Sequence, residues 1–140
     1  MVEFIKGDER EVINNPVNAP TTAFVIAESE KGYMLLYNKY RYCWEITGGC
    51  MEKGETPRDC AIRECLEESG QSIARDNLQF IGVAKYESMN AAIYYSFLEC
   101  EAPFVENEEI SALRWWKMGE EIEKMDIESL KLIEIYKSGA

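Results

Sequence analysis

The sequence contains no histidine, and its cysteines show none of the paired spacings that zinc sites use. The missing histidine excludes Ser-His-Asp and Cys-His catalysis, so any chemistry must use carboxylates, a metal ion or less common groups. We expect the five cysteines to be reduced and mostly buried thiols, at positions 43, 50, 60, 65 and 100.

Long apolar runs and positive charge are also scarce. No run is long enough to cross a bilayer, and Glu3, Asp8 and Glu9 do not fit a signal peptide, so we expect a cytoplasmic protein with no membrane partner. The formal net charge is −11. Duplex nucleic acid is bound through many lysine and arginine contacts to phosphate, so this balance argues against it as a partner.

What is present fits one compact domain over residues 1–140. Of these residues, 46% are hydrophobic and 29% charged, and the sequence has no internal repeat. Alternation and turn residues predict strands that are mixed with helices, which indicates a layered α/β or α+β domain. The predicted strands cover residues 21–27, 33–39, 44–47, 78–86, 91–100 and 112–117, and a closing helix covers 126–137.

The helix predicted over residues 57–69 has clear ends. Thr56 suits the N-cap, Pro57 the first helical position and Gly70 the C-terminal stop. Helical periodicity then places Ile62 and Leu66 on one side, which we expect to face the core.

The opposite side of this helix carries Glu64, Glu67 and Glu68. Like charges three and four residues apart repel, so the stripe needs compensation. One interpretation is a solvated acidic face, which suits a chain rich in glutamate. The other is a site for a divalent cation, because hard cations prefer carboxylate, carbonyl and water oxygens.

The spacing of this segment resembles the Nudix box, the signature of the Nudix hydrolase family. Seven positions match its glycine, glutamate and arginine pattern: Gly49, Glu55, Arg63, Glu64, Glu67, Glu68 and Gly70. The sequence departs from that pattern at Cys65 and Gln71, where aliphatic residues are usual. The resemblance implies the Nudix fold, a mixed β-sheet sandwiched between helices, with the box at residues 49–70.

The resemblance also implies roles for individual residues. Glu64, Glu67 and Glu68 correspond to ligands of Mg²⁺ or Mn²⁺, and the Gly48 carbonyl completes the set. Glu64 and Glu67 are the candidate catalytic residues, with Glu64 also the candidate base. Beside Gly49, the residues Glu55 and Arg63 correspond to a supporting ion pair that fixes the loop against the helix. Glu52 fits either this supporting role or a solvated charge.

Further site residues are left with alternatives. A late loop supplies an additional ligand or base in some family members, and Glu106, Glu108 and Glu109 are the candidates here, each of which also fits a solvated charge. Lys39 and Arg41 are candidates for contact with terminal phosphate, or plain surface residues. Ten aromatic residues are candidates for base stacking, with core packing favoured for each: Tyr33, Tyr37, Tyr40, Tyr42, Trp44, Tyr86, Tyr94, Tyr95, Trp115 and Trp116.

Three functions follow from the resemblance. The leading one is metal-dependent hydrolysis of a nucleoside triphosphate, ordinary or modified, to monophosphate and pyrophosphate. The second is hydrolysis of another nucleoside diphosphate derivative, such as a sugar nucleotide or a dinucleoside polyphosphate. The third is a catalytically silent nucleotide-binding module, against which the three intact glutamates argue. The expected partner in each case is a small nucleotide.

Overall fold

The computed structural model describes residues 1–139, and Ala140, the last residue of the expected domain, lies outside them. Within these residues, eight strands form one mixed sheet, accompanied by three α-helices and a short 3-10 helix. The helices are α1 (Glu9–Ile13), α2 (Pro57–Ser69), η1 (Arg75–Asn77) and α3 (Ile127–Lys137). The strands are β1 (Glu3–Ile5), β2 (Thr22–Ser29), β3 (Gly32–Asn38), β4 (Cys43–Glu45), β5 (Thr47–Cys50), β6 (Gln79–Lys85), β7 (Asn90–Phe97) and β8 (Ile110–Trp116).

Strand β2 lies at the centre of the sheet. It pairs in parallel with β7 along nearly its whole length, whereas every other strand pair is antiparallel. Its other edge is divided between two strands, because β5 pairs with residues 22–25 and β3 with residues 28 and 29. The sheet therefore forks beside β2, and the glycines of β5 lie at the fork.

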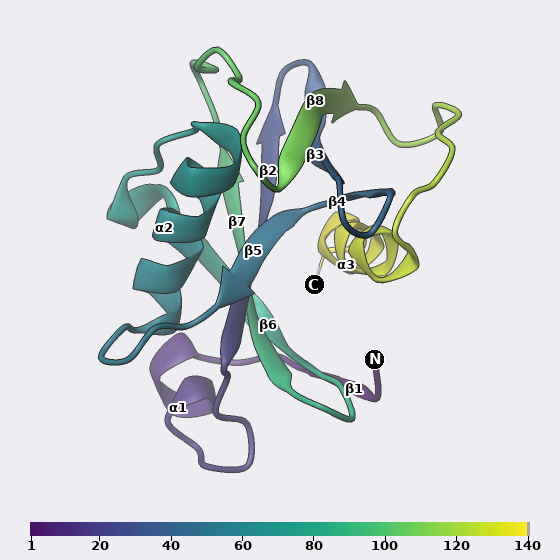
Figure 1. Ribbon diagram of the computed structural model, residues 1–140. Helices are drawn as coiled ribbons and strands as arrows, with labels where there is room; N and C mark the ends of the chain where they lie inside the picture. Colours follow the sequence, from purple (N-terminus) through teal and green to yellow (C-terminus); the bar gives the residue numbers. More distant parts are fainter. Residues whose placement is uncertain (140) are drawn as a thin grey trace.

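The two longer helices cover opposite faces of this sheet (Figure 1). One apolar cluster packs beneath α2 and includes Val25, Met34 and Tyr94. The other packs against α3 and includes Ile26, Leu35 and Ile93. Adjacent residues of one strand belong to different clusters because successive side chains of a strand point to opposite faces. The predicted mixed sheet between helices is confirmed.

Helix α2 begins and ends where the sequence predicted. The Thr56 hydroxyl accepts a hydrogen bond from the Asp59 N–H, and the Asp59 carboxylate accepts one from the Thr56 N–H, so both free donors are satisfied. At the other end, Gly70 adopts a left-handed conformation with φ 78°, which glycine tolerates without a steric cost.

The predicted core face of α2 is right for Ile62, which is partly buried against the apolar cluster beneath the helix, and wrong for Leu66. Leu66 is 51% exposed, and the helix instead buries Cys60, Ala61 and Cys65. These small side chains let α2 lie close to β2 and β5, and the carboxylate of Glu68 occupies the same buried side. Helical spacing alone favoured the larger apolar residues, but close packing against the sheet selects the smaller ones.

Several local expectations also change. Gly48 and Gly49 belong to strand β5 and pair with β2, although the sequence suggested a glycine loop. Strand β1 and helix α1 were not predicted. The cysteines are free, as expected, but they are not mostly buried, since only Cys60 and Cys65 fall in that class. Among residues 1–139, no helix is both long and apolar enough to span a membrane.

Candidate functional site

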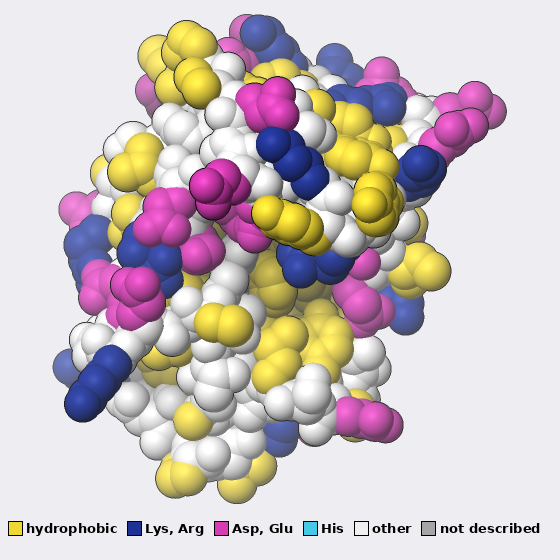
Figure 2. Space-filling view, viewed as in Figure 1, with side chains coloured by type: hydrophobic (Ala, Val, Ile, Leu, Met, Phe, Trp, Pro, Cys, Tyr) yellow, Lys and Arg dark blue, Asp and Glu magenta, His cyan; other side chains and the backbone are white. Residues whose placement is uncertain are grey.

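Helix α2 carries three glutamates toward the fork in the sheet, each in a different environment. The side chain of Glu64 is 15% exposed and that of Glu67 is 57% exposed, whereas residue Glu68 is buried. Figure 2 shows acidic side chains gathered over α2, with basic side chains among them. The row of three glutamates on α2 is therefore only partly a solvated face, because two of the three carboxylates are largely shielded from solvent.

Glu68 is the most deeply placed carboxylate of the group. Its Oε1 accepts hydrogen bonds from the Thr47 hydroxyl at 2.6 Å and from the Gly48 N–H at 3.1 Å. Burial raises the pKa of the Glu68 carboxyl, and the neighbouring Glu109 carboxyl raises it further. Two carboxyl groups thus lie side by side at low exposure, an arrangement that a bound cation would stabilise.

Glu64 packs directly against Gly49 of β5. A side chain at Gly49 would overlap the Glu64 carboxylate, so only glycine permits this approach. Burial raises the pKa of Glu64, and the nearby negative charges of Glu67 and Glu109 act in the same direction. The glycine therefore determines where this carboxylate lies.

Arg63 joins the acidic residues of this region into one network. Its guanidinium forms two hydrogen bonds with Glu55, at 2.6 and 3.0 Å, and one with the Cys50 carbonyl at 3.1 Å. Its Nη1 also reaches Glu64 at 3.1 Å and Glu67 at 3.2 Å. Hydrogen bonding to Arg63 lowers the pKa of Glu55. Arg63 thus ties the end of β5 to α2.

Two residues sit at the margin of this network. Glu52 approaches Arg63 Nε at 3.4 Å but keeps a side chain that is 68% exposed, so it combines both roles left open for it. Cys60 donates its thiol to the Gly49 carbonyl at 3.3 Å, a contact that sequence reasoning missed. It adds a second connection between α2 and β5, and no sequence pattern signalled it.

The late loop before β8 brings one of its three acids to the site. Asn107 fixes the loop, because its Nδ2 donates to the Glu68 carbonyl at 3.0 Å and its Oδ1 accepts from the N–H of Glu109 at 3.1 Å. Glu109 then lies beside Glu68, whereas Glu106 pairs with Lys39 at 2.9 Å and Glu108 is exposed.

The carboxylates are the type of ligand that a divalent cation prefers, although their spacing does not form a complete coordination shell. Within residues 1–139, no group of three or more acidic or cysteine side chains is close enough together to hold a metal ion. Arg63 accounts for part of this spacing, because its Nη1 binds the outer carboxylates Glu64 and Glu67. The adjacent carboxyls of Glu68, which is buried, and Glu109, which is partly buried, still match the oxygen ligands that Mg²⁺ and Mn²⁺ prefer.

A pocket of about 590 Å³ opens beside the glycines of β5, between the fork of the sheet and α3. Figure 2 shows the surface hollowed here, with apolar side chains inside the hollow. Its walls combine apolar and polar residues, among them Phe24, Ile46, Met89, Leu132, Arg41, Glu45 and Asp126. The pocket can therefore hold a flat, partly apolar group next to the carboxylates.

The two basic candidates occupy different places. Arg41 lines the pocket and forms two hydrogen bonds with Glu45, at 3.1 and 2.7 Å. Lys39 does not line it, and its ammonium is held by Glu106. Core packing holds for Tyr33, Tyr94 and Trp116, which are buried.

That expectation is wrong for Tyr40 and Tyr42, which are 71% and 67% exposed. Neither side chain packs into the core, because both residues lie in the turn between β3 and β4.

Comparison with known proteins gives consistent matches. The NUDIX domain model matches residues 18–134. The fold is similar to a pyrophosphohydrolase from Bacillus subtilis, with a TM-score of 0.74 and 18% identity over 99% of this chain and 90% of that one. It is also similar to a MutT NUDIX hydrolase from Burkholderia pseudomallei, with a TM-score of 0.70 and 18% identity over 82% and 95% of the two chains. An Ap4A hydrolase from C. elegans gives a TM-score of 0.65 and 19% identity over 85% and 99%.

Proposed function

Because the chain belongs to the NUDIX domain family, whose members are pyrophosphohydrolases, we propose that it hydrolyses a diphosphate linkage in a small nucleotide with a divalent cation. The observation that carries this proposal is the grouping of Glu64, Glu68 and Glu109 beside the glycines of β5, next to a pocket. The leading substrate is a nucleoside triphosphate, ordinary or modified, which gives a monophosphate and pyrophosphate.

The proposed metal ligands are Glu64, Glu67 and Glu68, with the Gly48 carbonyl. Glu109 is proposed as a further ligand or proton acceptor, because it lies beside Glu68. When bound, Mg²⁺ or Mn²⁺ polarises phosphate oxygens and lowers the pKa of a coordinated water.

The protein's own groups supply the remaining functions. Glu64 is the proposed base, since its carboxylate lies partly buried against Gly49, at the centre of the acidic group and next to the pocket. Arg63 positions Glu64 and the end of β5 without contacting the reacting atoms. In this proposal the apolar floor of the pocket takes the nucleoside, and Arg41, which lines the wall, contacts phosphate.

Lys39 is the weaker of the two basic candidates. Both cations are engaged by a carboxylate, Lys39 by Glu106 and Arg41 by Glu45, but Arg41 lines the pocket and Lys39 does not. We therefore propose that Lys39 chiefly holds the late loop against the end of β3, where its N–H also donates to the Glu109 carbonyl at 2.8 Å.

The test is a panel of nucleoside triphosphates, sugar nucleotides and dinucleoside polyphosphates, assayed with Mg²⁺ and with Mn²⁺ for phosphate released after phosphatase treatment. Analysis of the products separates the substrate classes. We expect turnover to require the metal ion and to be lost in Glu67→Gln. Binding of nucleotide with no turnover of any member under either metal would instead support the silent nucleotide-binding module.

A further inference from the structure

The turn between β3 and β4, residues 39–42, carries two exposed aromatic residues on either side of Arg41 in the sequence, and Arg41 lines the pocket. Tyr40 and Tyr42 are 71% and 67% exposed, the largest exposed fractions among the aromatic residues with exposed side chains, ahead of Phe97 at 47%. Covering a large water-exposed aromatic surface with a flat partner is favourable, because it removes apolar surface from water.

The backbone that carries these rings is held in a fixed shape. Asn38 is fully buried, and its Oδ1 accepts hydrogen bonds from the N–H groups of Tyr40 at 2.8 Å and Arg41 at 3.0 Å. Its Nδ2 donates to Glu45 at 2.9 Å, and Glu45 also binds the Arg41 guanidinium. The turn is therefore braced from inside the protein.

Tyr42 adopts a conformation that is unfavourable for its residue type. Its φ is 55°, in the left-handed region, while its N–H donates to the Asn38 carbonyl at 2.8 Å. Such residues are energetically unfavourable, persist only where the surroundings impose them, and gather at ligand-binding sites. The braced turn thus holds an exposed ring in a geometry that Tyr42 would not adopt by itself.

The position of the turn relates it to the proposed phosphate site. Arg41 and Glu45 both line the pocket, and the Lys39 N–H donates to the Glu109 carbonyl at 2.8 Å. Hydrogen bonds to Glu45 raise the pKa of the Arg41 guanidinium, and the charge of Glu109 adds to this effect. The turn therefore borders both the pocket and the carboxylates, and the positively charged Arg41 stands between the two tyrosines in the sequence.

We propose that Tyr40 and Tyr42 form a stacking platform for a second nucleobase, so that the site accepts dinucleoside polyphosphates in addition to nucleoside triphosphates. This inference rests on the proposed function and concerns the same site. One nucleoside occupies the pocket, the phosphate chain passes the carboxylates, and the second base stacks on the exposed rings. Every base has a π-face, so such a platform accepts different bases.

The reaction on this substrate is a simple hydrolysis. The oxygen of water forms a bond to one phosphorus, and the bond between that phosphorus and the bridging oxygen breaks. The bridging oxygen leaves with the other nucleotide, and a water proton passes to the proposed base and then to solvent. No oxidant, reductant or other co-reactant is required.

The platform predicts a difference between substrates that other roles do not. We compare diadenosine tetraphosphate with ATP, both with Mg²⁺, for the full chain and for Tyr40→Ala/Tyr42→Ala. Stacking contributes roughly fivefold to 150-fold in affinity per base, and for exposed rings we expect KM for the dinucleotide to rise about tenfold. Its kcat, and kcat/KM for ATP, should change less than about twofold.

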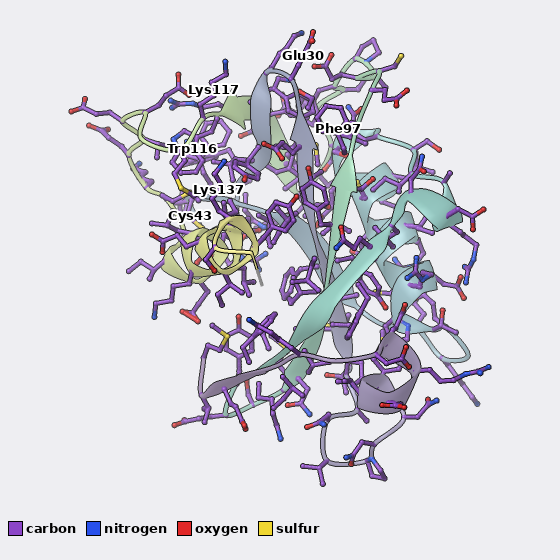
Figure 3. All side chains as sticks on the ribbon, turned by 180° about the vertical axis from the view of Figure 1, so that it is seen from behind. Glu30, Cys43, Phe97, Trp116, Lys117 and Lys137 are labelled. Carbon is purple, nitrogen blue, oxygen red and sulfur yellow. The ribbon has the colours of Figure 1, made fainter. Side chains whose placement is uncertain are left out.

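Two matched variants control this experiment. Tyr40→Phe/Tyr42→Phe keeps both rings and should retain wild-type KM for the dinucleotide. Phe97→Ala removes another exposed ring at the far end of β7. Figure 3 shows Phe97 apart from Cys43, the residue that follows the turn. This variant should leave both substrates unaffected.

Equal loss on both substrates, or none on either, would overturn the platform. Failure of the proposed function is distinguishable, because it appears as absent turnover of ATP and dinucleotide alike in the wild-type protein. In that case calorimetry with methylene-bridged, non-hydrolysable analogues decides. The platform is refuted if loss of both rings leaves the affinity for the dinucleotide analogue unchanged, and supported if that affinity alone falls about tenfold.

Discussion

Substituting Glu67 by glutamine separates a metal ligand from a solvated surface charge, because the structure assigns Glu67 little part in stability. Its side chain is 57% exposed, and its carboxylate hydrogen-bonds only to Arg63 Nη1, at 3.2 and 3.4 Å, among the described residues. An exposed ion pair four residues apart on a helix is worth about 0.3–0.5 kcal/mol. The substitution also removes repulsion between Glu67 and Glu64, which acts in the opposite direction.

The expected effects on stability and on rate therefore differ widely. The melting temperature of the metal-free protein should move by less than about 2 °C, which corresponds to roughly 0.5 kcal/mol in a chain of this size. The value of kcat/KM should fall at least about a hundredfold, or about 2.7 kcal/mol of transition-state stabilisation, because glutamine lacks the charge that holds a cation. The glutamine side chain keeps nearly the same shape, so a change in packing does not explain such a loss.

The assay measures phosphate release at saturating Mg²⁺ on the best substrate, beside thermal melts in the presence of a chelator. Glu134→Gln is the matched control, because Glu134 is an exposed glutamate on α3, away from the site. It should keep the wild-type rate. A rate for Glu67→Gln within about threefold of wild type would refute the reasoning, and would return Glu67 to a solvated acidic face.

Four further predictions address the same site. Millimolar Mg²⁺ or Mn²⁺ should raise the melting temperature, since a ligand of the native state at a hundred times its Kd adds about 2.7 kcal/mol to the free energy of unfolding. Unchanged melting temperatures with both ions, together with no heat of binding in calorimetry, would count against the metal site. Arg63→Ala should lower both turnover and metal affinity, while Arg63→Lys restores part of each; wild-type values in Arg63→Ala would remove its positioning role. Gly49→Ala should displace the Glu64 carboxylate and lower kcat at least about tenfold with the fold retained by circular dichroism, because small misplacements of reacting groups are costly. Because the pKa of Glu68 is raised, the folded protein holds this proton to higher pH than the unfolded chain does, so the stability of the metal-free protein should fall as pH rises above the usual carboxyl pKa. Urea unfolding at several pH values should show this slope, and the slope should be smaller in Glu68→Gln. An unchanged slope in Glu68→Gln would contradict the prediction.

Local signals in the sequence were enough to define α2 and the family. Thr56, Pro57 and Gly70 delimit the helix through hydrogen bonds and backbone preferences that act within a few residues, so no distant contact is needed to predict them. The spacing of glycine, arginine and glutamate over residues 49–70 likewise indicated which carboxylates share one side of α2. Alternating apolar residues predicted six strands near their observed places, although the division of 44–47 into β4 and β5 was missed.

Tertiary structure decided which distant groups join the box. The sequence offered three acids in the late loop, and only the loop geometry set by Asn107 brings Glu109 beside Glu68. The buried side of α2 was likewise settled by the sheet, which accommodates Cys65 where helical periodicity favoured Leu66. Contacts between segments far apart in the chain have no periodic signature, so they emerge only when the sheet is assembled.

The exposure of Tyr40 and Tyr42 was also decided by the tertiary structure. Composition favours core packing for any aromatic residue, because burial of a large apolar ring is usually favourable. The observed turn leaves both rings in solvent because the buried side chain of Asn38 closes the chain between β3 and β4 before either ring reaches the core. The sequence by itself thus determined the chemistry of the box, and the folded chain determined which pocket, late-loop acid and rings surround it.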